Sequence, residues 1–254
     1  MNKKTPFPKP HIPAWVKKTC GALFWIALWW LIARLLNKEL LVPTPAQTVA
    51  ALGALAADPA FWQAAGLSML RILCGFLLSA VVGTAGGILS HRFAPFDWLF
   101  SPLMHLIRSV PVASFIILAL VWIHTPYLPI FISFLMVVPL FWGNIRTGME
   151  HTDIKELEMG KVLGLSRFRL WREIHIPALS PYFRTACVTG LGFAWKSGVA
   201  AEVICRPDLS LGDLLQGAKV HLETPTVFAL TVVIAILSMA LELLLNLLWK
   251  EREQ

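Results

Sequence analysis

Six apolar blocks, each close to the length of a membrane-crossing helix, constrain the fold of this chain more than any other feature. A helix of about 20 apolar residues crosses a hydrocarbon layer roughly 30 Å thick. The chain is 57% hydrophobic and 15% charged, whereas soluble domains are about 45–50% apolar and about 25% charged. The sequence therefore predicts an all-α polytopic membrane protein with six transmembrane helices. The blocks lie at about residues 19–36, 68–90, 100–123, 127–146, 183–204 and 226–248.

Lysine and arginine are distributed unevenly between the segments that join these blocks. With the N-terminus in the cytoplasm, 15 of the 22 basic residues fall in cytoplasmic segments and five in outer ones. Basic residues collect on the cytoplasmic side of membrane proteins, so this orientation is favoured. We therefore expect residues 1–18 and 250–254 to be cytoplasmic tails of a multi-pass protein that is surrounded by membrane lipid.

Residues 19–66 are predicted to form the first transmembrane helix and an outer-surface segment. The second part of this range, residues 43–66, is too short and too interrupted to span the membrane. Thr44 or Thr48 can cap a short helix there, which we expect to end near Asp58.

Small residues recur at intervals of four in the second block, at Ser79, Gly83 and Gly87. Small residues on one helix face let two helices approach closely in lipid. The pattern predicts close packing of this helix against a neighbour.

Several functional classes are excluded by what the sequence lacks. The net charge of +7 does not indicate a nucleic-acid partner, because the basic residues lie between apolar blocks rather than on one solvated face. The four cysteines form no CxxC or His/Cys ligand spacing, so no metal site is expected. There is no GxxxxGK[ST] loop for ATP, and HExxH and GxSxG are also absent. We expect neither a cofactor nor catalytic residues in this chain.

The longest predicted cytoplasmic loop, at about residues 147–181, contains a compact basic segment. Residues 153–163 can form a helix that Gly164 ends, because glycine readily takes the left-handed conformation of a helix C-terminus. Ser166 can cap a second helix, which we expect Pro177 to end. The residues leave two interpretations open. The segment is either an amphipathic helix on anionic lipid or a docking element for a soluble partner.

The same segment resembles the signature of permease subunits of binding-protein-dependent ABC importers of type I. Glu158-Met159-Gly160-x3-Gly164-x9-Ile174-x-Ile176-Pro177 matches the pattern EAA-x3-G-x9-I-x-L-P, with Met159 and Gly160 where alanines are usual and Ile176 for leucine. The resemblance implies that this EAA-type loop is a coupling helix that docks on a cytoplasmic ATPase. The coupling residues that it implies are Glu158, Gly160, Gly164, Ile174 and Pro177.

Three further stretches are similar to the nitrate, sulfonate, taurine and bicarbonate branch of that family. They are Arg108-Ser-Val-Pro111, Ala194-Trp195-Lys196 with Ala200-Ala201-Glu202, and Leu211-Gly212. The resemblance covers about residues 68–248, and we take residues 67–249 as the permease domain.

The resemblance also implies the partners and location of the chain. The implied partners are two cytoplasmic ATP-binding subunits, a second and identical permease copy, and an extracytoplasmic solute-binding protein. The implied location is the inner membrane of a bacterium. The expected solute is small and anionic or zwitterionic, such as a sulfonate, taurine, nitrate or bicarbonate, or a heterocycle similar to thiamine precursors. ATP hydrolysis then belongs to a partner subunit.

Arg108, Lys196 and Glu202 are charged residues within or near the predicted spans, and Arg71 and Glu242 lie nearer to span ends. A lone charge facing lipid costs at least about 2.5–3.5 kcal/mol, so each of the first three is expected to line a translocation path or to form a structural pair. Lys196 and Glu202 are six positions apart and point about 120° away from each other on a helix, which argues against a direct pair. The alternative function is a membrane-embedded enzyme or scaffold, but such an enzyme needs more ionisable groups at one depth.

Overall fold

The computed structural model describes residues 14–36 and 40–250, and these residues form helices joined by short connections. Of the tails predicted at 1–18 and 250–254, residues 1–13 and 251–254 lie outside the described residues, and the remaining residues belong to helices. No strand occurs among the described residues, so the prediction of an all-α protein is confirmed. The elements are α1 (Ala14–Leu36), α2 (Pro45–Ala57), α3 (Pro59–Arg92), α4 (Ala94–Ser109), α5 (Val112–Ala119), η1 (Thr125–Tyr127), α6 (Leu128–Glu150), α7 (Ile154–Val162), α8 (Arg167–Leu170), η2 (Trp171–His175), α9 (Ile176–Cys205), α10 (Leu211–Val220) and α11 (Thr224–Lys250).

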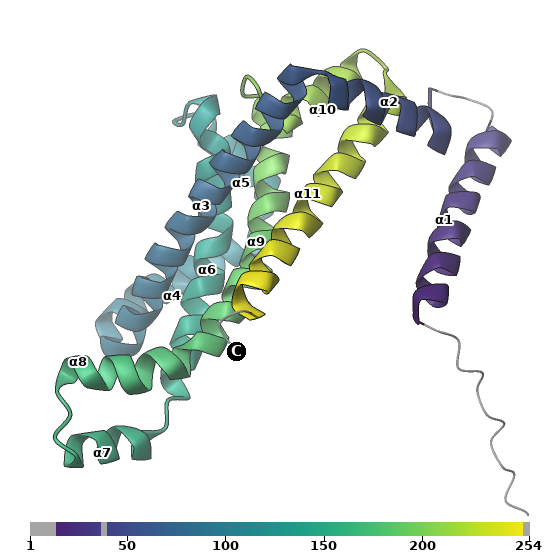
Figure 1. Cartoon of the computed structure of the whole chain (residues 1–254). Coiled ribbons are helices and arrows are strands. Elements are labelled where there is room, and N and C mark those ends of the chain that lie inside the picture. Colours follow the sequence, from purple (N-terminus) through teal and green to yellow (C-terminus); the bar gives the residue numbers. More distant parts are fainter. Residues whose placement is uncertain (1–13, 37–39, 251–254) are drawn as a thin grey trace, which may run out of the picture.

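The long helices α3, α6 and α9 pack side by side and form the centre of the bundle (Figure 1). The helix α11 lies along α9, and α4 and α5 pack against α6. The short helices α2 and α10 lie at one end of the bundle, and α7 and α8 lie at the opposite end. We call the end with α7 and α8 the loop end.

The first helix stands beside the bundle rather than within it (Figure 1). It is joined to the bundle near its C-terminal part by Trp29, whose Nε1 donates a hydrogen bond to the Pro43 carbonyl at 3.1 Å. The Trp29 ring also stacks on Phe228 of α11, with 5.8 Å between the ring centroids.

Four of the described helices, α1, α3, α6 and α11, are long and apolar enough to cross a membrane. A fifth crossing is possible if α4 and α5 act together as one broken span. The predicted fifth span corresponds to α9, which has 30 residues. Its Lys196, Glu202 and many small polar residues make it less apolar than the others. The count of six spans therefore stays a prediction.

The span predicted at about 100–123 is not one continuous helix, because it comprises parts of α4 and α5, which meet at an angle of 105°. The break lies at Val110-Pro111. Pro111 has no N–H to donate, and a proline disfavours helical geometry in the residue before it. Val110 accordingly takes an extended conformation, with φ −84° and ψ 133°.

Local capping signals set the ends of α2 and α3. Thr44 forms a capping box with Gln47 at the start of α2, which selects Thr44 over Thr48 as the cap. The predicted end near Asp58 is confirmed, and the Asp58 side chain then caps α3 by accepting from Ala60 N–H at 2.9 Å. The second long helix thus begins at Pro59, nine residues earlier than the apolar block indicated.

The small residues of α3 face α6, as their spacing predicted. A methyl group on Gly83 would lie 2.6 Å from Cβ of Phe141, and one on Gly87 would lie 2.7 Å from the Trp142 carbonyl oxygen. The Ser79 hydroxyl donates to the Phe134 carbonyl at 2.9 Å. These contacts hold α3 and α6 at a separation that larger residues at Gly83 and Gly87 would not allow.

Candidate functional site

The helix α7 ends at the glycine elbow that the sequence predicted. Gly164 has φ +71°, in the left-handed region that favours glycine. The Leu165 N–H donates to the Gly160 carbonyl at 3.0 Å, which is the six-to-one bond of a Schellman motif. Ser166 then caps α8 by accepting from Arg169 N–H at 3.4 Å. The two-helix arrangement of the loop is therefore confirmed.

Two residues of the EAA-type signature meet across the elbow. Gly160 is buried, and a methyl group there would lie 2.6 Å from Cδ2 of Leu170 and 3.1 Å from Cδ1 of Ile174. Glycine at 160 thus lets α7 pack directly on the segment that follows the elbow. Glu158 is exposed on α7 and contributes nothing to this contact.

The expectation that Pro177 ends the second helix is wrong. Helical geometry continues from α8 through η2, a π-helical turn, into α9. The Ile176 N–H bonds to the Trp171 carbonyl, five residues back. This turn shifts the hydrogen-bond register directly before Pro177, which then occupies an early position of α9 where a missing N–H is tolerated.

An apolar surface is exposed on the two short helices. It consists of Met159 and Val162 on α7, Leu163 directly after α7 and Phe168 on α8, whose exposed fractions lie between 60% and 86%. Val162 and Leu163 are three and four positions after Met159, so these three side chains share one side of the helical turn. We call these four residues the coupling patch. The sequence predicted the helices that carry these residues but not that their apolar side chains form one exposed surface, although their spacing in a polar loop was the available signal.

Glu202 lies near the opposite end of the bundle and is fully buried. Its Oε2 accepts hydrogen bonds from the Ser68 hydroxyl at 2.7 Å and from Gly212 N–H at 3.3 Å. The Ser68 hydroxyl in turn accepts from Leu211 N–H at 2.9 Å. Together Ser68 and Glu202 satisfy two N–H groups of the first turn of α10, which fixes α10 to α3 and α9. This geometry favours a structural role for Glu202.

The chain from α9 to α10 is held by a second contact from α3. The Arg71 guanidinium donates to the carbonyls of Asp208 and Leu209, at 3.1 and 3.3 Å. Leu209 and Arg206 have positive φ values of 51° and 50°, so the connection is tightly folded. One turn of α3 therefore anchors both this connection and the start of α10.

Arg108 and Lys196 do not join Glu202. Arg108, near the end of α4, donates a hydrogen bond to the Pro139 carbonyl of α6. Lys196 is exposed on α9 and has no ion pair in residues 14–36 and 40–250. It is thus outside the core of this single chain. Within the same residues, no three His, Cys, Asp or Glu side chains are grouped as metal ligands.

The helical bundle, the exposed loop-end segment and the EAA-type signature define a membrane permease that works with a separate energy source. Residues 75–251 match the family described as binding-protein-dependent transport system inner membrane component. Because this match covers well over half of the chain, the chain belongs to that family. It is therefore an ABC transporter permease rather than an enzyme, and the family implies an ATPase and a solute-binding protein as partners.

Relatives with named transport roles are similar to this chain at 28–29% identity. The taurine transport system permease protein of Escherichia coli is 28% identical over 228 residues, which cover 86% of this chain and 82% of that protein. The nitrate import permease protein of Leptolyngbya laminosa is 28% identical, over 57% of this chain and 52% of that protein. The bicarbonate transport system permease protein of Synechocystis is 29% identical, over 60% and 54%. These relatives confirm the expected branch of the family.

Proposed function

We propose that two copies of this chain form the translocation path for a small anionic or zwitterionic solute, and that two cytoplasmic ATP-binding subunits drive it. Both termini and the loop end lie in the cytoplasm, as the basic residues indicate. The solute class is supported by relatives whose names give taurine, nitrate and bicarbonate as transported species. A solute-binding protein delivers the solute to the end of the bundle that carries α2 and α10.

The observation that carries the docking role is the coupling patch. Its four large apolar side chains are exposed at the loop end of the bundle, and the loop there is rich in basic residues. In Figure 1, α7 lies beyond α8, on the side away from the bundle. A surface there faces away from the hydrocarbon layer, so burial against a soluble partner accounts for it better than contact with lipid.

Co-purification with the ATPase tests this role. Leu163→Ser removes apolar area from the centre of the patch, and fully burying a leucine side chain is worth about 1.5–3 kcal/mol. We expect this variant to retain the ATPase at least tenfold less well than the wild type. The matched control is Val220→Ser, which removes a similarly exposed apolar side chain at the opposite end. Equal retention of the ATPase by both variants would contradict docking at the coupling patch.

Lys196 is the residue best placed to act on an anionic solute. Its exposed position on α9 lets it face a path between two permease copies, where a positive charge raises the local concentration of an anion. In proteoliposomes with the ATPase and the binding protein, Lys196→Met should abolish transport while Lys196→Arg keeps part of it. Loss of assembly in Lys196→Met would indicate a structural pair instead, and unchanged transport would remove Lys196 from the mechanism.

A further inference from the structure

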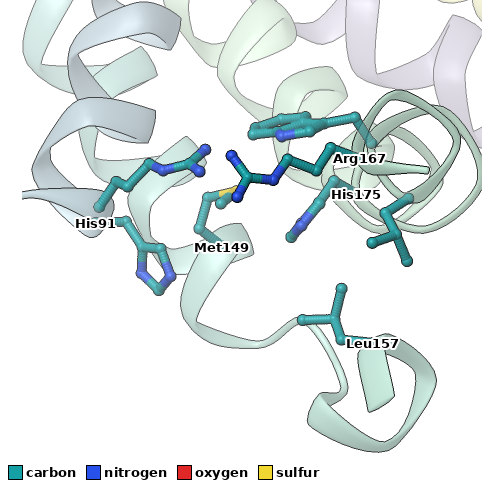
Figure 2. A pocket seen from close by; sticks show the side chains of 8 residues that line it. His91, Met149, Leu157, Arg167 and His175 are labelled. Carbon is teal, nitrogen blue, oxygen red and sulfur yellow. The ribbon is translucent and has the colours of Figure 1, made fainter. Parts of the chain in front are cut away.

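A cavity of about 480 Å³ lies at the loop end of the bundle, beside residues 154–175, which we call the coupling segment. The ends of α3 and α6 form one side of it, and α7, α8 and η2 form the other. Its polar lining consists of His91 and Arg92 from α3, Arg167 from α8 and His175 from η2. Figure 2 shows Arg167 and His175 extending into the space around Met149, with His91 on the facing side. We call this space the basic cavity.

The basic cavity carries positive charge that no ion pair neutralises within residues 14–36 and 40–250. None of its lining side chains is acidic, and neither Arg92 nor Arg167 forms an ion pair in the described part of the chain. Asp97 and Glu150 lie at the same end, but both form ion pairs with Arg146 instead. Two guanidinium groups from two different helices therefore remain available to one ligand.

His175 adds an unused hydrogen-bonding atom to the cavity. Its ring packs on Trp171 with 4.6 Å between the ring centroids, and its buried Nδ1 has no partner among the described residues. Burial, and then the neighbouring His91 and Arg92, lower the pKa of His175. An oxyanion would accept a hydrogen bond from the tautomer protonated at Nδ1 and would offset the surrounding positive charge.

We propose that the basic cavity binds a phosphate group, carried either by a lipid headgroup or by a soluble phosphate. The planar forks of two arginines match the oxygens of phosphate. The cavity also lies where α3, a helix long and apolar enough to cross a membrane, ends, and basic pockets between transmembrane helices bind anionic headgroups. A bound phosphate would connect α3 to α8 and η2 and would hold the coupling segment against the bundle. This site does not depend on the solute that is transported.

The test uses the purified full-length chain in detergent without the ATPase, which has phosphate-binding sites of its own. One arm titrates inorganic phosphate in a calorimeter. The other arm measures retention of dioctanoyl phosphatidylglycerol by native mass spectrometry, with dioctanoylglycerol as the ligand that lacks phosphate. We expect Arg92→Gln and Arg167→Gln each to lower the affinity at least about tenfold, because each removes charge-assisted hydrogen bonds.

Arg169→Gln is the matched control, since Arg169 is exposed on the same short helix but does not line the cavity. It should bind like the wild type, and all variants should elute as monodisperse species. Binding that depends on Arg92 and Arg167 in the phosphate arm identifies a soluble ligand, and in the lipid arm alone it identifies a headgroup. Equal binding by all variants, or binding in neither arm, overturns the proposal. The phosphate arm and the lipid arm both measure binding directly, so neither depends on transport or on ATPase docking.

Discussion

Replacing Gly164 by valine isolates the contribution of the glycine elbow to coupling. Apart from Gly164 and its two chain neighbours, no described heavy atom lies within 4 Å of the position that a Cβ at 164 would take, so the Cβ meets no packing neighbour. The remaining effect is on the backbone, because φ is +71°. A left-handed conformation costs a residue with a side chain roughly 1–2 kcal/mol, and a β-branched residue is the least suited to it.

This cost is large enough to change the population of the native elbow conformation. Outside the elbow, α7 is anchored by the packing of Gly160 on Leu170 and Ile174. A penalty of one to two kcal/mol changes a conformational equilibrium by a factor of about 5–30. The fraction of molecules with the coupling patch correctly oriented should fall by up to this factor. Solute-stimulated ATPase activity should fall with it.

The assay is solute-stimulated ATP hydrolysis by the chain reconstituted with its ATPase and binding protein. Gly164→Asn is the matched control, because asparagine tolerates the left-handed region far better than valine. We expect Gly164→Asn to keep most of the stimulated activity. Expression and unfolding temperature should be unchanged in both variants, because the elbow lies outside the central helices. If Gly164→Val is stimulated as strongly as Gly164→Asn, the elbow does not control coupling.

Three other predictions concern stability and orientation. Gly83→Ala should lower the unfolding temperature, since overpacking costs about 1–3 kcal/mol, whereas Gly66→Ala on the same helix has open space and should be neutral or stabilising. Ser68→Ala leaves buried groups unpaired and should cost about 1–3 kcal/mol, whereas the exposed Ser109→Ala should cost little. Thermal unfolding in detergent measures all four. A reporter active only outside the cytoplasm, fused at Gln254, should be inactive, and activity there would reverse the proposed topology.

Features set by neighbouring residues were predictable from the sequence. The cap at Thr44 or Thr48, the left-handed Gly164 and the cap at Ser166 each depend on a few adjacent residues; the structure selects Thr44 for the first and confirms the other two. The close packing of α3 was predictable for a similar reason, because residues such as Gly83 need only a repeating interval to share one face. The sequence did not identify α6 as the partner helix, since the choice depends on the fold of the whole chain.

The environment of Glu202 shows where prediction from sequence reached its limit. Helix geometry argued against a direct pair between Glu202 and Lys196, and the ion pairs of the described residues include no such pair. The sequence did not identify Ser68, which is 134 residues away, or the first turn of α10. Hydrogen bonds across such separations depend on how the helices pack, and no local pattern encodes that packing. The basic cavity was unpredictable for the same reason, because its arginines come from α3 and α8.

The continuity of the helix past Pro177 has a mechanical consequence. A helix ended by that proline would leave α8 as a separate arm, joined to the bundle by a flexible connection. Instead α8 and η2 continue into α9 without a break. The helix α9 has 30 residues, which span about 45 Å at a rise of 1.5 Å per residue. A displacement of Phe168, the coupling-patch residue on α8, would therefore be carried through η2 and along α9, past Lys196, to Glu202 and the anchored start of α10. The α8 part of the proposed docking surface and the opposite end of the bundle are thus connected by continuous helical geometry, whereas the other three residues of the coupling patch lie on the other side of the glycine elbow.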